Sequence, residues 1–232
     1  MKVFFDTETT GLPNWKSPEK NTPRMVQLGL IVTDDFGVIR ETLGIIFKSE
    51  GYTISKEASD IHGITDEIAN TYGVNRSHEF FCRLFDIFHN ANEIIAHNYS
   101  FDKLIINGEF LRLGLGKIDD SKSFCTKEAS ADVCKITFIS SHTSRFGTKE
   151  TYKWPKLVEV YEFLFNENIV GTHDALTDVR ATMRVYFELK RRYHSLLYSK
   201  SEELPLVDTG LALNDINKYP EIIRSLYPKE KL

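Results

Sequence analysis

Hydrophobic and polar positions in the first half of the chain follow patterns that predict β-strands. Short apolar runs with the length of buried strands lie at residues 2–7, 25–33, 38–48 and 93–98, with a shorter one near 123–126. The second and third runs are separated by Asp34, Asp35 and Gly37, which are residues that favour turns. We therefore predict that these two strands form an antiparallel hairpin.

Apolar residues at helical spacing predict four helices in the rest of the chain. They cover residues 76–90, 100–113, 155–166 and 174–195, and Thr172 is expected to cap the last one. Strands followed by strand–helix alternation predict an α/β fold with a mixed sheet. The remainder of 115–153 is polar and irregular.

The chain divides by pattern into residues 1–195, which we predict to be one domain, and a C-terminal extension at 196–232. The extension contains three prolines and shorter hydrophobic pieces. It is either an extra packed element, a partner-binding tail or partly disordered, and its role is open.

Composition places the chain among ordinary globular proteins, with 41% hydrophobic and 27% charged residues. A formal charge of −4 argues against broad electrostatic binding of nucleic acid, although local cations or bound metals would still permit it. Three cysteines without C-x-x-C spacing indicate neither a disulfide framework nor a zinc site. Without a long apolar run or a signal peptide, we expect a cytoplasmic protein with no membrane partner.

The first strand ends in two carboxylates whose placement needs a chemical explanation. Side chains two apart on a strand share a face, so Asp6 and Glu8 lie on the same side as Phe4. Two like charges at the edge of a core repel each other and lose hydration. A basic partner, a shared proton or a bound cation would compensate.

Two further acids occupy similar positions. Asp102 follows the fourth strand at the start of a helix, and Asp178 lies at the edge of the apolar stripe of the last helix. Arg180 and Arg184 lie mainly on other faces of that helix, so a basic partner is not evident. A cluster of oxygen ligands without nearby cysteine fits Mg²⁺ or Mn²⁺ better than zinc.

Three ordered motifs resemble a known family. FDTETTG (5–11), HNYSFD (97–102) and His173 with Asp178 five residues later resemble the motifs of DnaQ-like 3′→5′ exonucleases, in the histidine branch of the DEDD superfamily. That family includes proofreading subunits of bacterial DNA polymerase III, ribonuclease T and oligoribonuclease. ASDIHGITDE (58–67) resembles the proofreading members. The resemblance covers about residues 1–195 and implies a ribonuclease H-like mixed β-sheet flanked by helices.

The resemblance also implies roles for five residues. Asp6, Glu8 and Asp178 would hold the first of two Mg²⁺ or Mn²⁺ ions, with Asp6 bridging to the second, which Asp102 would support. His173 would be the general base that takes a proton from the attacking water. The branch that uses tyrosine would need it at position 174, where this chain has aspartate.

The same resemblance predicts a set of nucleic-acid-binding residues: Thr9, Gly11, Leu12, His62, His97, Asn98 and Phe101. The first three would bind the 3′-terminal nucleotide, with Leu12 wedged between the last two bases, and His62 would meet the terminal base. Each has a simpler alternative. Thr9 and Gly11 are also residues that favour turns, and His62 would also fit a hydrogen-bonded histidine on the surface. His97 and Asn98 would close the end of a strand by hydrogen bonds, and Phe101 would pack in the core.

One more stretch combines basic and aromatic residues. TKETYKWPK (148–156) interleaves Lys149, Lys153 and Lys156 with Tyr152 and Trp154. This mixture suits binding of a single strand, and a solvated loop edge is an equal alternative.

The function that the family resemblance implies is metal-dependent 3′→5′ exonuclease activity on the 3′ ends of single-stranded DNA, in proofreading or repair. One alternative is an exoribonuclease of the ribonuclease T or oligoribonuclease type, since sequence does not show how a 2′-OH is sensed. Another is a catalytically silent nucleic-acid-binding domain. Whether the chain acts alone or partners a DNA polymerase is open.

Overall fold

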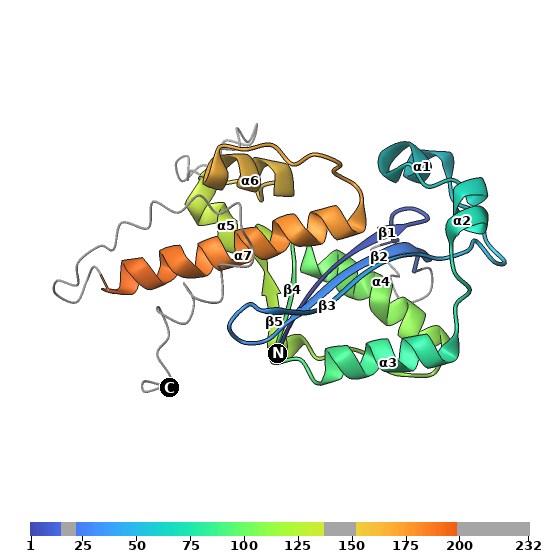
Figure 1. The fold of residues 1–232 in the computed structure, drawn as a ribbon. Helices are drawn as coiled ribbons and strands as arrows, with labels where there is room; N and C mark the ends of the chain where they lie inside the picture. Colours follow the sequence, from blue (N-terminus) through green and yellow to red (C-terminus); the bar gives the residue numbers. More distant parts are fainter. Residues whose placement is uncertain (15–21, 137–151, 199–232) are drawn as a thin grey trace, which may run out of the picture.

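The computed structural model describes residues 1–14, 22–136 and 152–198, with side chains placed through residue 193 (Figure 1). Its centre is a five-stranded sheet in the order β3-β2-β1-β4-β5. The strands are β1 (Lys2–Thr9), β2 (Met25–Thr33), β3 (Ile39–Ile46), β4 (Glu93–Ala96) and β5 (Ser123–Cys125). The first three pair antiparallel, while β4 lies parallel to β1 and to β5, so the predictions of a hairpin and of a mixed sheet are confirmed.

Seven α-helices surround this sheet in the described part of the chain, together with a short 3-10 turn at Asp120–Lys122. They are α1 (Lys56–His62), α2 (Asp66–Tyr72), α3 (His78–His89), α4 (Tyr99–Arg112), α5 (Thr126–Cys134), α6 (Leu157–Phe165) and α7 (Ala175–Tyr198). The four predicted helices are present. The sequence did not predict α1, α2 or α5, because the first two are only seven residues long and α5 contains few large apolar residues to form a helical stripe.

The prediction that Thr172 caps the last helix was wrong. Asp174 takes that place, because its Oδ1 accepts hydrogen bonds from the backbone N–H and the hydroxyl of Thr177, both at 3.0 Å. An aspartate one residue before the helix can reach the third helical N–H, as capping requires.

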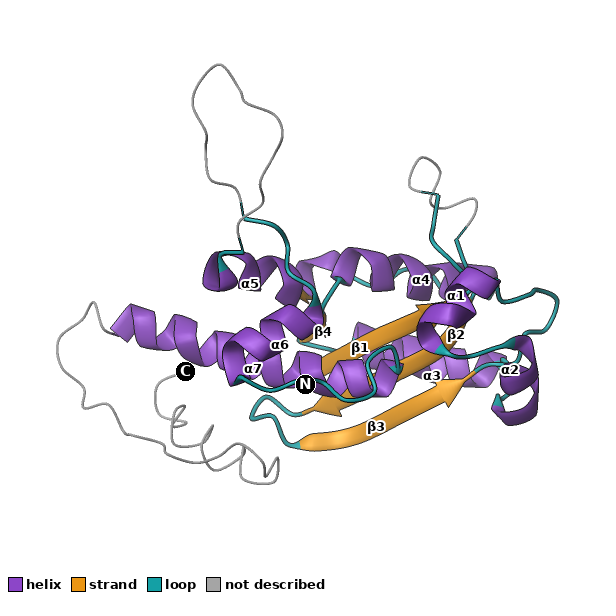
Figure 2. Cartoon of the chain, turned by 90° about the horizontal axis from the view of Figure 1, so that it is seen from above, coloured by secondary structure: helices purple, strands orange, loops and turns teal. Residues whose placement is uncertain are grey.

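Opposite faces of the sheet are covered by different helices (Figures 1 and 2). Phe5 on β1 packs with residues of α3 and α4, among them Phe88 and Tyr99. Phe4, its neighbour on the other face, packs with Val179 and Tyr186 of α7. The alternation predicted for the first strand is therefore confirmed, and it turns Asp6 and Glu8 toward α7.

None of the helices that the structure describes is long and apolar enough to cross a membrane. Residues 199–232, most of the predicted C-terminal extension, lie outside the described part, as does Lys149.

Candidate active site

The start of α7 lies directly on β2, beside the carboxylates of β1. Gly29 on β2 pairs with Asp6 on β1. A Cβ at Gly29 would lie 2.2 Å from the carbonyl oxygen of Ala175, the first residue of α7. Because no side chain fits there, the glycine permits the close approach of this helix to the acids.

A glutamine fixes the same helix end in register. Gln27, which pairs with Glu8, is 6% exposed in an otherwise apolar strand. Its Nε2 donates to Asp174 Oδ2 at 2.8 Å, and its Oε1 accepts from the backbone N–H of Ala175 at 3.1 Å. Although desolvation opposes it, the hydrogen bonds from Gln27 and Thr177 lower the pKa of Asp174, so this acid is a charged cap.

His173 and Asp178 meet Glu8 at the end of β1. The backbone N–H of His173 donates to Asp178 Oδ2 at 3.1 Å, and His173 has a left-handed backbone with φ 66°. One ligand atom from each of Glu8, His173 and Asp178 lies within 4.8 Å of the others. The other oxygen of Asp178, Oδ1, is buried and has no hydrogen-bond partner among the described residues.

Asp102 joins the cluster from the opposite face of the sheet. It is 2% exposed, in the first turn of α4. Its Oδ1 accepts hydrogen bonds from the backbone N–H of Thr7 at 3.0 Å and from the Thr7 hydroxyl at 2.8 Å. Thr7 thus ties Asp102 to the strand between Asp6 and Glu8.

Burial and mutual repulsion raise the pKa values of all four carboxylates. Desolvation is the largest cause in each case, and neighbouring carboxylates add to it. The pKa of Glu8 rises to about 8 and that of Asp102 to about 7, in spite of the Thr7 hydrogen bonds to Asp102. The pKa of Asp6 is raised well above its usual range, and that of Asp178 is raised even though His173 opposes the shift.

No described Lys or Arg forms an ion pair with Asp6 or Glu8. Within the described part of the chain, therefore, a shared proton or a bound cation is left as the compensation. Carboxylate oxygens are the donors that hard divalent cations prefer, and the buried Asp178 Oδ1 accepts no hydrogen bond from any residue that the structure describes. The cluster fits a divalent metal site.

The predicted nucleotide-contacting residues of the β1–β2 connection divide into two kinds. Leu12 is 85% exposed, as a residue that meets substrate would be. Thr9 is buried, and its hydroxyl donates to the carbonyl oxygen of Gly11 at 2.7 Å, which fits the turn alternative. His62 Nε2 lies 3.2 Å from the carbonyl oxygen of Thr9, so the end of α1 contacts the end of β1. Burial is the main cause that lowers the pKa of His62.

His97, Asn98 and Phe101 follow β4 and fit the structural alternatives more closely. His97 is buried, with Nδ1 3.0 Å from the hydroxyl of Thr126 and Nε2 3.2 Å from the carbonyl oxygen of Pro155. Both ring nitrogens are thus occupied, and burial lowers the pKa of this imidazole to about 4. Asn98 is half-buried, and Phe101 packs against the main core.

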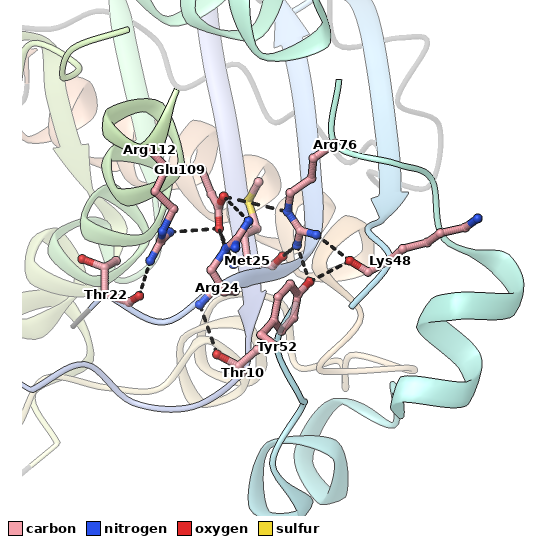
Figure 3. Close-up of polar contacts among 9 residues, drawn as sticks. All are labelled: Thr10, Thr22, Arg24, Met25, Lys48, Tyr52, Arg76, Glu109 and Arg112. Carbon is pink, nitrogen blue, oxygen red and sulfur yellow. Dashed lines mark hydrogen bonds and ion pairs between the residues drawn. The ribbon is translucent and has the colours of Figure 1, made fainter. Parts of the chain in front are cut away.

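An arginine network holds the segment around α1 and α2 against α4 (Figure 3). The buried Glu109 of α4 accepts hydrogen bonds from Arg24 at 2.9 Å and from Arg112 at 3.1 Å, and Arg76 lies 3.8 Å away. Arg76 also donates to the hydroxyl of Tyr52 and to two backbone carbonyl oxygens. This network fixes the segment that brings His62 to the end of β1.

The sequence matches the RNase_T family model, described as an exonuclease, over residues 3–186. The chain belongs to this exonuclease family. It is 27% identical over 202 residues to the DNA polymerase III subunit epsilon of Buchnera aphidicola, covering 86% of this chain and 78% of that relative. It is also 27% identical over 187 residues to an uncharacterized exonuclease of Escherichia phage 186, covering 79% and 85% of the two chains.

Solved structures of exonuclease I share the fold of this exonuclease. E. coli exonuclease I in complex with a dT13 oligonucleotide matches with a TM-score of 0.63 and 20% identity, over 86% of this chain and 42% of that one. A further exonuclease I structure matches with a TM-score of 0.64 over 85% and 43%. The chain thus spans less than half of exonuclease I. The exonuclease is a DnaQ-like 3′→5′ hydrolase with a ribonuclease H-like fold, as the motifs indicated.

Sequence inspection of the exonuclease did not select Gln27, Gly29 or Thr7. A polar residue and a glycine inside the apolar run 25–33 were nevertheless visible in the sequence. A glycine within a strand often marks a position where another part of the backbone comes close, so Gly29 indicated where another element would pack on the strand.

Proposed function

We propose that this exonuclease removes nucleotides from the 3′ ends of single-stranded DNA with the help of two Mg²⁺ or Mn²⁺ ions. The main support is the convergence of four carboxylates with raised pKa values, one of which has a buried oxygen without a partner among the described residues. Such a cluster becomes stable at neutral pH when cations neutralise it.

The proposal assigns a role to each of the five residues of the cluster. Asp6, Glu8 and Asp178 would hold the first ion. Asp6 and Asp102 would help to hold the second, with Asp102 fixed in place by its hydrogen bonds from Thr7. When bound, such ions would supply positive charge for the attacking and leaving oxygens of a phosphoryl displacement. His173 takes the proton of the attacking water, because its exposed side chain stands beside Glu8 and Asp178.

The choice of DNA follows from the proteins that this chain resembles. One is a subunit of a DNA polymerase, and the exonuclease I structures include a complex with a dT13 oligonucleotide. We therefore place the protein in DNA proofreading or repair, with a DNA polymerase as a possible partner. RNA is the alternative substrate. We also propose a cytoplasmic location, a catalytic domain at 1–195 and an extension at 196–232.

Digestion of a 5′-labelled single strand of DNA, and of its RNA counterpart, tests the proposal. Each is incubated with Mg²⁺, with Mn²⁺ or with chelator. We expect a ladder that shortens from the 3′ end, requires the metal and disappears in Asp6→Ala. His173→Ala should be slower by about 10²- to 10⁴-fold, the usual contribution of a general base.

His78→Ala is the matched control, because His78 is an exposed histidine at the start of α3. It should digest DNA at the wild-type rate. Digestion that continues in chelator would refute the metal requirement. A strand that is retarded on a gel but not shortened would indicate a binding domain, and faster digestion of RNA would make the exoribonuclease alternative correct.

A further inference from the structure

An exposed tryptophan and a lysine lie side by side close to the candidate active site. Trp154 is 62% exposed, although large aromatic side chains usually bury most of their surface. The Nζ atom of Lys127 lies 5.5 Å from the centroid of its indole ring. We call Trp154 and Lys127 the Trp154 patch.

Hydrogen bonds connect the Trp154 patch to the start of α4. Lys127 Nζ donates to Asn98 Oδ1 at 3.2 Å, and its backbone N–H donates to the carbonyl oxygen of His97 at 3.2 Å. Asn98 in turn accepts the backbone N–H of Asp102 at its carbonyl oxygen. The ammonium group is thus connected through Asn98 to the backbone of Asp102, whose side chain belongs to the proposed metal cluster.

Buried contacts hold the tryptophan in this place. His97 is 7% exposed, and its Nε2 lies 3.2 Å from the carbonyl oxygen of Pro155, the residue after Trp154. A neutral, buried imidazole therefore anchors the backbone that presents an exposed ring. A solvated loop edge would not need such an anchor.

The charge near the Trp154 patch favours an anion. Lys127 is the second residue of α5, and its ammonium reaches the residue that precedes α4. Neither helix begins with a capping side-chain hydrogen bond. The first turns also contain one acid each, Asp102 in α4 and Glu128 in α5, so the positive group that a phosphate would meet is the Lys127 ammonium.

We propose that the Trp154 patch binds one nucleotide of a single-stranded substrate next to the reacting end, with the base stacked on Trp154 and a phosphate on Lys127. The inference rests on the proposed nuclease function and names how the strand is held. Every base has a flat face, so stacking suits an enzyme that must accept any sequence. The structural role of His97 is then to position Trp154.

Tryptophan fluorescence tests binding without any cleavage. The sequence has two tryptophans, so a Trp15→Phe variant leaves Trp154 as the single emitter. In chelator, we expect an eight-residue thymidine oligonucleotide and its uridine counterpart to quench this emission, because a stacked base quenches indole. If fluorescence anisotropy of a labelled oligonucleotide shows binding while Trp154 emission stays constant, the proposal is wrong.

Kinetics provide the second measurement. The KM of the wild type should fall as the DNA substrate grows from two to eight nucleotides, and this dependence should flatten in Trp154→Ala. For the longest substrate, the KM of Trp154→Ala should be about 5- to 100-fold higher than that of the wild type, as expected for one lost base stack. The KM of Trp154→Phe should lie close to the wild-type value, because phenylalanine can also stack on a base. In Lys127→Gln, the slope of the logarithm of the binding constant against the logarithm of the salt concentration should become shallower by about the amount expected for one phosphate contact.

Tyr72→Ala is the matched control, since Tyr72 is 75% exposed on α2 and should keep the wild-type length dependence. The two proposals can fail separately. A wild type that digests DNA, with an unchanged length dependence in Trp154→Ala, overturns the Trp154 patch alone. A wild type that digests nothing, with quenching of Trp154 intact, overturns the nuclease function and leaves the patch.

Discussion

Replacing Glu8 by glutamine removes one negative charge from the carboxylate cluster without changing the size of the side chain. We predict that Glu8→Gln makes the metal-free protein more stable at pH 8 and abolishes its nuclease activity. Stability and activity should change in opposite directions, because the carboxylates that would bind the ions are buried away from water and repel one another without them.

The size of the effect follows from the pKa of Glu8. Folding raises it from 4.5 to about 8, mainly through desolvation, and a pKa difference of one corresponds to about 1.4 kcal/mol. The upper limit is therefore about 5 kcal/mol in the free energy of unfolding at pH 8. Glu8 is coupled to the neighbouring carboxylates, and the contributions of coupled groups are not additive. We therefore expect Glu8→Gln to raise the free energy of unfolding by about 2–3 kcal/mol.

The sign of the pH dependence is also determined. Because the pKa of Glu8 is higher in the folded state, the two states differ between pH 4.5 and about pH 8. In this range the folded protein keeps the Glu8 proton, whereas the unfolded chain has lost it. The stability of the metal-free wild type should thus fall as the pH rises through this window. The advantage of Glu8→Gln should be near zero at pH 4.5 and largest near pH 8.

Thermal unfolding in chelator, at several pH values, measures the effect. For a chain of this size, 2–3 kcal/mol corresponds to roughly 4–12 °C in Tm. Glu162→Gln on α6 is the matched control, because this glutamate is exposed, and its effect should stay within about 0.5 kcal/mol. The reasoning is refuted if Glu8→Gln lowers Tm at pH 8, or if its effect is the same at pH 5 and pH 8.

Three further substitutions, with Gly44→Ala as a control for one of them, test how the site is held. Gln27→Ala removes both hydrogen bonds to the start of α7 and should cost about 1–3 kcal/mol with a fall in kcat, measured by denaturant unfolding and by digestion of labelled DNA. Gly29→Ala should cost about 1–3 kcal/mol and most of the activity, because its Cβ would meet the carbonyl oxygen of Ala175 at 2.2 Å. Gly44→Ala should be milder, since a Cβ there meets only a flexible side chain at 3.0 Å, and equal effects would contradict the argument. Glu109→Gln should cost about 3–5 kcal/mol by leaving three arginines without their carboxylate, and an unchanged Tm would show that the network is not stabilising.

The sequence by itself determined the features that depend on short, regular spacing. The alternation in β1 placed Asp6 and Glu8 on one face, and the turn residues after β2 set the hairpin. Asp102 was recognised at the start of a helix and Asp178 at the edge of an apolar stripe, and the motifs that contain them resemble a known family. Such patterns need only neighbouring residues to be correct, which is why they can be found without a structure.

Tertiary structure decided what depends on contacts between distant parts of the chain. Gln27 and Asp174 are 147 residues apart, and no local pattern states that the first will hold the second. The same holds for the burial of His97, whose ring meets the carbonyl oxygen of Pro155, the residue after Trp154. Whether a polar side chain faces solvent or a partner depends on packing across the whole sheet, and that packing is established only when the distant elements meet.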